Sequence, residues 1–455
     1  MDLRSKPNIV LINCDDLGYG DLACYGSRVH STPELDDLAA QGIRFTNFYM
    51  ASPVCSPSRG AMMTGCYPRR IGFGSFEGKG VLFPGQGVGL NPEETTMASL
   101  LRDQGYATMI IGKWHCGDQP EFLPTEHGFD EYYGIPYSND MGRQVHREHY
   151  PPLPLMVNDQ VLQEQPDLTS LTERYAEQAV RFIRKNKEQP FFLYLAHMYV
   201  HLPLYVPDRF SRHSRNEAYG AAVEYIDWVT GVLVDELKQN GIENDTLIIF
   251  TSDNGSRADH EGSNGPLRGR KGTTWEGGMR VPCIMYWPGE IEAGQVCREI
   301  ASSIDFLPTL VQLAGGQVPD DRIIDGKDIR PLMFQAPHSS PVHQAFFYYA
   351  GDTLEAVRAG SWKLHVRKGR EAVQALYHLD RDPGESQNVY EDHPNVVQAL
   401  RKLLDDCRED LGDAAMGMEG ANCRPIGTVK NPKTLTTYDE KHPYMVALYD
   451  LEEFG

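Results

Sequence analysis

The chain has 455 residues, of which 41% are hydrophobic and 23% charged, a composition typical of a globular protein with a large core. Its formal net charge of -20 argues against nucleic acid or an anionic membrane as partner, because both would repel it. The nine cysteines show neither a disulfide framework nor a paired zinc spacing, which fits a reducing compartment. No apolar segment precedes the first strand, so we expect a cytoplasmic protein, or an exported one if a signal peptide was trimmed.

Apolar runs alternate with amphipathic segments through the first three quarters of the chain. The first run, residues 8–12, is followed by Thr32 and Pro33, which begin a helix that Gly42 ends. Further helices are predicted at 93–105, 171–187 and 217–241, and further strands at 107–111, 191–196 and 246–251. This alternation predicts an α/β fold with a mostly parallel sheet between two layers of helices.

From about residue 345 the pattern changes to short segments of alternating polarity, which predict a small antiparallel sheet. The segments are 346–349, 356–359, 362–366 and 376–379. A helix is expected over 395–406, followed by a tail from about Gly417 that wraps the surface. We therefore divide the chain into a larger domain, residues 1–344, and a C-terminal subdomain, residues 345–455.

Charged and polar side chains follow each of four predicted strands. In chain order they are Asp15 and Asp16, Lys113 and His115, His197 and His201, and Asp253 and Asn254. Ligands of open α/β sheets bind beyond the carboxyl ends of the strands, so we expect these groups to meet on one face. Paired acids at a strand end are more often solvated turn residues, and the same caution applies to single lysines and histidines. A fifth segment, described next, favours a functional site over solvated turn residues.

That segment, Cys55-Ser56-Pro57-Ser58-Arg59 with Thr64-Gly65 after it, resembles the signature of the type I sulfatase family. Its fixed residues arise by chance in such a chain roughly once in ten thousand. In the family the cysteine is oxidised to Cα-formylglycine, whose hydrate carries two hydroxyls, one to attack sulfur and one to expel sulfate. The structural alternative is a buried cysteine before a proline turn.

Two further segments resemble family motifs, Gly112-Lys113-Trp114-His115 and the stretch from Arg268 to Gly278. By this resemblance Lys113 and Lys271 hold sulfate oxygens, and Arg59 orients the formylglycine. Sulfate transfer from an alcohol also needs a proton for the departing oxygen and a base for the nucleophile.

The resemblance assigns those proton transfers to histidines. His201, with Lys271, lies near the leaving oxygen, and His115 takes the proton of the second hydroxyl as sulfate is expelled. His197 is interpreted as structural. Ser138, in a stretch similar to one that contacts sulfate in arylsulfatases, is a candidate substrate contact.

The acidic pairs resemble the metal ligands of the family. Asp15, Asp16, Asp253 and Asn254 supply hard oxygen donors, which suit Ca²⁺ or Mg²⁺ rather than zinc. The resemblance favours Ca²⁺ beside the modified Cys55, which becomes a fifth ligand.

The resemblance covers nearly the whole chain and implies an alkaline-phosphatase-like α/β fold, with residues 1–344 as the catalytic domain. Within the family the chain is similar in texture to the arylsulfatase A and N-acetylgalactosamine-6-sulfatase groups, and residues 261–266 resemble the latter. The implied activity is hydrolysis of sulfate monoesters, with a 6-sulfated hexosamine of glycosaminoglycan as the leading substrate and aryl sulfates also accepted. The implied partners are that sulfated substrate and a formylglycine-generating maturation enzyme, and the oligomeric state stays open.

Two other functions remain open at this point. One is a phosphonate or phosphate monoester hydrolase of the same superfamily, and the other is a noncatalytic sulfated-glycan binder, which applies if Cys55 stays a thiol. Specificity is expected in two polar loops that leave the strand ends, 140–149 and 256–264. Their candidate substrate-binding residues are Arg143, His146 and His260, with Arg147, His149, Arg257 and Asp259 beside them.

Overall fold

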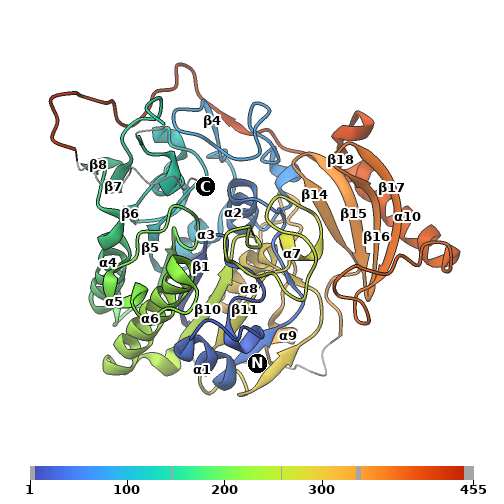
Figure 1. Cartoon of the computed structure of the whole chain (residues 1–455), viewed down its shortest axis with the longest axis horizontal. Coiled ribbons are helices and arrows are strands. Elements are labelled where there is room, and N and C mark those ends of the chain that lie inside the picture. Colours follow the sequence, from blue (N-terminus) through green and yellow to red (C-terminus); the bar gives the residue numbers. More distant parts are fainter. Residues whose placement is uncertain (1–5, 145–146, 258, 335–339, 445–455) are drawn as a thin grey trace.

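The computed structural model describes residues 6–144, 147–257, 259–334 and 340–444. A ten-stranded sheet of order β12-β2-β11-β10-β1-β9-β5-β6-β7-β8 forms its centre (Figure 1). The strands are β1 (Asn8–Cys14), β2 (Ile43–Phe45), β5 (Ala107–Gly112), β6 (Glu131–Gly134), β7 (Pro154–Val157), β8 (Gln160–Glu164), β9 (Phe191–Ala196), β10 (Thr246–Ser252), β11 (Cys283–Tyr286) and β12 (Gln295–Cys297). The five from β10 to β6 run parallel, whereas β11 and β7 are antiparallel to their inner neighbours. The predicted α/β class is therefore confirmed.

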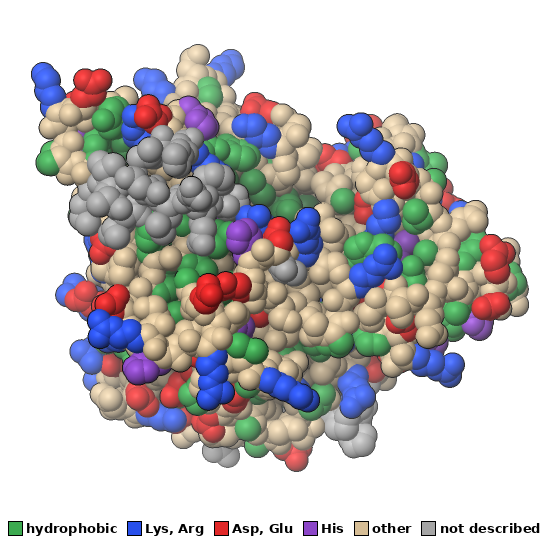
Figure 2. All heavy atoms as spheres, viewed as in Figure 1, with side chains coloured by type: hydrophobic (Ala, Val, Ile, Leu, Met, Phe, Trp, Pro, Cys, Tyr) green, Lys and Arg blue, Asp and Glu red, His purple; other side chains and the backbone are tan. Residues whose placement is uncertain are grey.

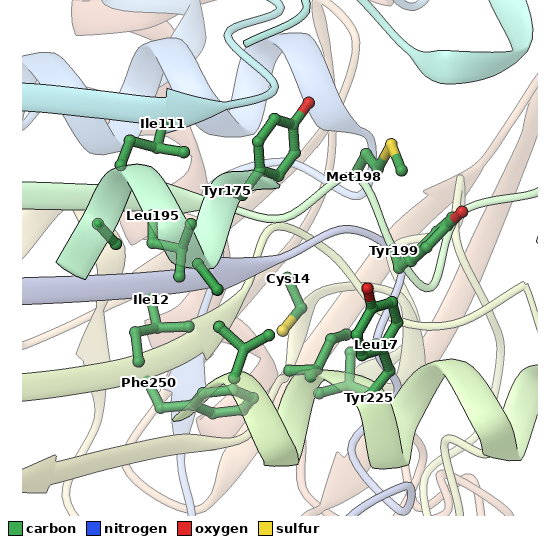
Figure 3. Close-up of a cluster of buried hydrophobic side chains, with 14 of the residues drawn as sticks. Ile12, Cys14, Leu17, Ile111, Tyr175, Leu195, Met198, Tyr199, Tyr225 and Phe250 are labelled. Carbon is green, nitrogen blue, oxygen red and sulfur yellow. The ribbon is translucent and has the colours of Figure 1, made fainter. Parts of the chain in front are cut away.

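Alternate residues of the central strands face opposite helical layers, because successive side chains of a strand point to opposite faces. On β1, Val10 and Ile12 pack in the core under α1 (Pro33–Gln41), α4 (Leu168–Asn186) and α6 (Glu217–Gln239). Figure 3 shows part of this layer, with Ile12 of β1 and Phe250 of the neighbouring strand β10 close together.

Ile9 and Leu11 of the same strand pack in the opposite core, with residues of α2 (Cys55–Thr64), α3 (Met97–Asp103) and α8 (Phe306–Leu313). The remaining helices are α5 (Asp208–Ser211), α7 (Glu276–Met279), α9 (Arg330–Phe334) and α10 (Pro394–Leu411). In the part of the chain that the structure describes, no helix is long and apolar enough to cross a membrane.

Two helices differ from the sequence prediction. The helix expected from residue 93 begins at Met97, because Thr96 and Ser99 cap it through reciprocal hydrogen bonds. The helix α2 was not predicted, since Pro57 follows the cysteine so closely. Proline is tolerated there because the first-turn amides have no partner within a helix.

The C-terminal part is the predicted antiparallel sheet, of order β14-β15-β16-β17, with α10 packed on it. Its strands are β14 (Phe346–Ala350), β15 (Thr353–Ala359), β16 (Trp362–Lys368) and β17 (Glu371–His378). Short strands pair elsewhere as β3 (Phe48–Tyr49) with β13 (Ala301–Ser302), β18 (Gly412–Asp413) with β19 (Met418–Glu419), and β4 (Val88–Gly89) with β20 (Gly427–Thr428).

The tail after α10 runs back over the larger part of the molecule. Lys433 donates its backbone N–H to Gln119 at 2.9 Å, and the Tyr444 hydroxyl donates to Glu164 at 2.7 Å. The domain boundary at residue 344 stays a prediction.

A buried ion network joins the small sheet to the larger part. Lys363 on β16, fully buried, donates to Glu276 at the start of α7 at 2.9 Å and pairs with Glu385 at 3.0 Å. The hydroxyls of Tyr49 and Tyr348 donate to the two oxygens of Glu276 at 2.6 and 2.8 Å. Burial alone raises the pKa of Glu276, but Lys363 and its neighbours hold the net pKa well below the usual range, so the carboxylate is charged.

We expect Lys363→Met to lower the free energy of unfolding by about 3–5 kcal/mol, because it leaves two buried carboxylates without their ammonium. Lys185→Met is the matched control, since Lys185 is 64% exposed and its pair with Glu131 contributes at most about 1 kcal/mol. Urea denaturation followed by tryptophan fluorescence measures both. Equal losses in the two variants would contradict the structural role of this network.

Candidate active site

Four side chains from three separate segments of the chain meet beyond the carboxyl ends of β1 and β10. Asp15, Asp16, Cys55 and Asp253 are all buried, and one ligand atom from each lies within 4.8 Å of the others. The parallel register explains the meeting, because Cys14 pairs with Ser252 and the next residues leave the sheet side by side. The backbone N–H of Asp253 donates to the Cys14 carbonyl at 3.0 Å, which continues the pairing past the strand ends.

Asp16 connects this cluster to the second lysine motif. Its backbone adopts a left-handed conformation, with φ of 64°, and its N–H donates to Asp253 at 3.2 Å. Its side chain accepts hydrogen bonds from Lys271 at 2.8 Å and from the Asn254 amide at 2.7 Å. One carboxylate therefore fixes the ammonium of Lys271.

Cys55 is the first residue of α2 and is 2% exposed. Its thiol donates to Asp15 at 3.4 Å. Burial, then Asp15, raises the pKa of the thiol well above its usual range, so it is neutral at physiological pH. Arg59, one turn further along α2, pairs with Asp253 at 2.8 Å and donates to the Lys113 carbonyl at 2.8 Å.

Lys113 enters the cluster from the end of β5. Its ammonium lies 2.5 Å from Asp15 and donates to the Ser138 hydroxyl at 3.2 Å. Burial opposes its charge, but Asp15 raises the net pKa of Lys113 above the ordinary value. Gly112 before it has φ of 106°, and an added Cβ would lie 1.8 Å from the Ala196 carbonyl oxygen. Only glycine allows β5 to turn this close to β9 and present Lys113.

The hydrogen bonds of two histidines fix their protonation. The Nε2 of His115 contacts the Leu82 carbonyl at 3.0 Å, so Nε2 carries the hydrogen, and Nδ1 is buried without a hydrogen-bond partner among the described residues. Burial, then Lys113, lowers the pKa of His115 well below its usual range. His115 is therefore neutral, with a free lone pair on Nδ1.

The tautomer of His201 is also fixed by a backbone carbonyl, but through Nδ1 instead of Nε2. Its Nδ1 contacts the Leu202 carbonyl at 2.6 Å, which leaves Nε2 3.8 Å from Asp16. Burial, then Lys271, lowers the pKa of His201, so the ring is neutral more of the time than a free histidine. His201 and Lys271 thus approach the same carboxylate.

The cluster fits a hard divalent cation. Three carboxylates supply oxygen donors, and the Oδ1 atom of Asn254 is buried without a hydrogen-bond partner among the described residues. An unpaired buried oxygen is costly unless something donates to it or binds it. A cation of the calcium or magnesium type would bind this oxygen together with the carboxylates. A neutral thiol is a poor ligand for such an ion, so Cys55 fits the set only after conversion to an oxygen-bearing group.

Most of the residues predicted from sequence come together in this site. The residues joined by the contacts above are Asp15, Asp16, Cys55, Arg59, Lys113, Ser138, His201, Asp253, Asn254 and Lys271. His115 lies in the same strand-end segment as Lys113, two residues further along the chain. His197 is buried, and burial lowers its pKa to about 3, which agrees with a structural role.

The predicted substrate-binding residues are less uniform. The Arg143 guanidinium stacks on the Tyr438 ring, 3.6 Å from its centroid, and pairs with Glu148 at 3.6 Å. His260 is half-buried in the loop after β10. His146 lies outside the described residues. The carbonyl of Leu82, which fixes the tautomer of His115, gave no sequence signal, because every residue carries a carbonyl.

Comparison with known proteins identifies the family. The sulfatase family model matches residues 7–316, and a C-terminal model, N-sulphoglucosamine sulphohydrolase, matches residues 270–410. Arylsulfatase A of Bos taurus is 40% identical, with 88% of this chain and 87% of the relative covered. N-acetylgalactosamine-6-sulfatase of Rattus norvegicus is 36% identical, with 94% and 92% covered. The solved structure of Ps i-CgsB in complex with k-i-k-neocarrahexaose matches with a TM-score of 0.80 at 32% identity, covering 88% of this chain and 92% of that one.

The fold and the site together define a hydrolase of sulfuric esters. The chain belongs to the sulfatase family, since the family model covers more than half of it and the relatives match over nearly its whole length. The structural neighbours include the phosphonate monoester hydrolase of Agrobacterium radiobacter, at 19% identity and a TM-score of 0.65, which shares the fold. The predicted family, enzyme class and alkaline-phosphatase-like fold are confirmed.

We expect Asp16→Ala and Asp253→Ala to lose a bound divalent metal and to lower sulfatase activity by about a hundredfold or more, since each removes an anionic oxygen donor. Elemental analysis of purified protein, alongside hydrolysis of an aryl sulfate, measures both effects. Asp208→Ala is the control, because Asp208 is 80% exposed and pairs with Arg212 on the surface. Zinc at full occupancy, or full activity after exhaustive chelation, would contradict the assignment.

Proposed function

We propose that this sulfatase hydrolyses sulfate monoesters of carbohydrates, with a formylglycine derived from Cys55 as nucleophile and with Ca²⁺, or Mg²⁺ in its place, beside it. The environment of Cys55 carries the proposal. A cysteine that acts as a thiolate is held in that form by nearby positive charge. Burial and Asp15 instead raise the pKa of Cys55, so its position favours a cysteine that is chemically converted before it acts.

Conversion of Cys55 requires a second protein. The thiol is 2% exposed at the start of α2, and it is enclosed by the acidic cluster. An enzyme cannot reach such a group in the folded chain, so a formylglycine-generating maturation enzyme would act before folding is complete.

The converted residue and the metal would supply what the unmodified chain lacks. The hydrate of a formylglycine supplies two hydroxyls on one carbon, one to attack sulfur and one to help expel sulfate, while a divalent cation supplies positive charge to the sulfate oxygens. Asp15, Asp16, Asp253 and Asn254 would hold the cation.

The cationic side chains bind and orient the sulfate group. Arg59 is fixed by Asp253, and it therefore anchors the start of α2 against the carboxylates. Lys113 and Lys271 each pair with a different carboxylate of the cluster, Asp15 and Asp16. Held in this way, their ammonium groups are preorganised to stabilise negative charge on the nonbridging sulfate oxygens. Ser138, which bonds to Lys113, can contact the same oxygens.

The two histidines move protons at opposite ends of the reaction. His201 and Lys271 lie 3.8 and 2.8 Å from the same oxygen of Asp16, and this pair can deliver a proton to the departing alcohol. His115 holds its hydrogen on Nε2, so its Nδ1 can accept the proton of the second hydroxyl when sulfate leaves. Accepting a proton at Nδ1 requires a neutral ring, which burial favours for His115. Delivering a proton requires a protonated group. Because burial and Lys271 lower the pKa of His201, while Asp16 helps to raise the pKa of Lys271, the ammonium of Lys271 is the protonated member of the pair.

The relatives support a sulfated carbohydrate as substrate. One of them is named for N-acetylgalactosamine 6-sulfate, and a similar solved structure holds a carrageenan-type oligosaccharide. A 6-sulfated hexosamine of glycosaminoglycan is therefore the leading candidate, and the arylsulfatase A relative supports activity on aryl sulfates. A phosphonate hydrolase or a noncatalytic binder is not favoured, because the relatives that match over most of the chain are sulfatases.

We expect Cys55→Ala to lower sulfate release by about 10⁴-fold or more while leaving the fold intact, because the position supplies the nucleophile and little apolar volume. Hydrolysis of an aryl sulfate and circular dichroism measure the two effects. Mass spectrometry of the Cys55 peptide from active wild-type protein should show the mass loss of a thiol converted to an aldehyde. An active protein with an unmodified thiol would refute the covalent mechanism.

We also expect His260→Ala and Arg143→Ala to lower kcat/KM for a sulfated hexosamine about tenfold, with less than a twofold change for a small aryl sulfate that lacks the distal groups. His213→Ala is the control for His260, since His213 is an exposed histidine that follows α5. Equal losses on both substrates would show that these loops do not determine specificity.

A further inference from the structure

The segment after β1 contains a buried acid that the mechanism does not use. Asp21 is fully buried, and both oxygens of its carboxylate accept hydrogen bonds. One oxygen accepts the backbone N–H of Ser263 at 2.8 Å. The other accepts the backbone N–H of Gly18 at 2.7 Å and the hydroxyl of Tyr219 at 2.6 Å. One carboxylate therefore joins the segment after β1, the loop between β10 and α7, and helix α6.

These three donors require a group that only accepts hydrogen bonds. An ionised carboxylate offers two acceptor oxygens and no donor, whereas the amide of an asparagine offers one oxygen and an NH₂ group that donates. An amide at position 21 would therefore direct its NH₂ group at one or two of the three donors. A buried N–H or O–H that loses its acceptor is costly, so the joined segments would move apart.

The segments that Asp21 joins also approach each other closely through their backbones. The N–H of Gly20 donates to the Ser263 carbonyl at 2.8 Å. An added Cβ at Gly18 would lie 2.2 Å from the Ser263 carbonyl oxygen, and one at Gly20 would lie 2.6 Å from the Gly265 carbonyl oxygen. Two glycines thus let the loop lie directly against the segment after β1, where Asp21 holds it.

The loop beyond Ser263 is tied to the backbone of Lys271. The side chain of Asn264 donates to the Ser256 carbonyl at 2.9 Å and to the Gly269 carbonyl at 3.2 Å. The Ser256 carbonyl also accepts the backbone N–H of Lys271 at 3.0 Å. A displacement of Ser263 is therefore passed to Lys271 through the neighbouring Asn264.

Lys271 has to lie at a fixed place relative to the segment after β1. Its ammonium donates to Asp16 at 2.8 Å, and its side chain is still 16% exposed. It helps to line a hollow of about 320 Å³, together with Arg257, Asp259 and Arg270. Figure 2 shows basic, acidic and histidine side chains close together near the middle of this face, where Figure 1 places the loops between β10 and α7. The alcohol side of a sulfate ester can reach Lys271 from this hollow.

We propose that Asp21 is a positioning residue, which holds Lys271 against Asp16 so that the ammonium of Lys271 can give a proton to the departing alcohol. This inference rests on the proposed function, in which that proton is needed. Asp21 is buried, so it acts through the loop and not by contact with the ester. A misplaced ammonium matters most when the departing oxygen is strongly basic, because such an oxygen leaves only with a proton.

Asp21→Asn should therefore separate substrates by their leaving group. At about pH 8, above the pKa of about 7 to which burial raises the Asp21 carboxyl, the wild-type side chain is ionised. We expect kcat/KM for a 6-sulfated hexosamine to fall about a hundredfold, since a general acid contributes about that much or more. The loss on 4-nitrophenyl sulfate should be at least about tenfold smaller, because nitrophenolate leaves without a proton. Bound metal, measured by elemental analysis, should stay as in the wild type.

Asp227→Asn is the matched control. Asp227 is 3% exposed and accepts the backbone N–H groups of Glu34 and Leu35, at 3.3 and 2.9 Å, where α1 begins. Burial raises its pKa to about 7 as well. Its amide variant should lower the melting temperature as Asp21→Asn does, yet leave the ratio of the rates on the two substrates unchanged.

Equal losses on both substrates in Asp21→Asn, the same substrate dependence in Asp227→Asn, or loss of bound metal would overturn the positioning role. If Asp21→Asn does not fold, Tyr219→Phe carries the test, because it removes one donor and adds none. It should show the same substrate dependence, with a loss of about three- to tenfold on the sulfated hexosamine and no loss on the nitrophenyl ester. A wild-type protein that releases sulfate from neither compound would refute the proposed function itself, and this role with it.

Discussion

The pairing of β1 with β10 in parallel register is the constraint on which the site depends. It delivers Asp15 and Asp253 to the same place, both fully buried and both acidic. Two carboxylates cannot be buried side by side without positive charge nearby. Arg59 lies 2.8 Å from Asp253 and Lys113 lies 2.5 Å from Asp15, and together they supply that charge. Removing either side chain would leave a buried carboxylate without its counter-charge. The cations to which we assign sulfate binding are thus also needed to offset these buried carboxylates.

This arrangement explains why the groups proposed to bind sulfate and move protons come from so many elements. Lys113 follows β5, His201 follows β9, and Lys271 comes from the segment before α7, yet each is held by an acid at the end of β1 or by a backbone carbonyl. The strands fix the positions of the acidic side chains, and the segments that follow them carry the lysine and histidine side chains. Because the partners are charged and buried, small displacements are costly, which keeps the donors in place for the developing charge of the reaction.

Much of the site could be predicted from sequence, because an apolar run followed directly by charged residues marks the end of a buried strand. An apolar run followed by Asp15 and Asp16, and another followed by Asp253 and Asn254, predicts both the strands and their convergence. The signature around Cys55 identified the family but not the helix that begins there, since local proline content predicts a turn.

Side-chain pairs between residues far apart in sequence could not be predicted. Lys363 in β16 looks like an ordinary polar residue of an exposed strand, and only the fold reveals that it is buried against Glu276. In the same way, nothing local indicates that Asp259 is shared by two arginines, because Arg270 is brought to it by the turn before Lys271. Periodicity detects which face is buried, whereas pairing between side chains requires the tertiary structure.

The ion network of Glu276 constrains how the larger part of the chain and the small C-terminal sheet can evolve. Glu276 follows Lys271 by five residues, and its counter-charge comes from a strand of the small sheet. A sheet of different sequence could not be exchanged for this one by recombination unless it also brought a lysine to the same buried position. The two parts are therefore expected to have diverged together, as one evolutionary unit, even though they look like separate modules in the chain.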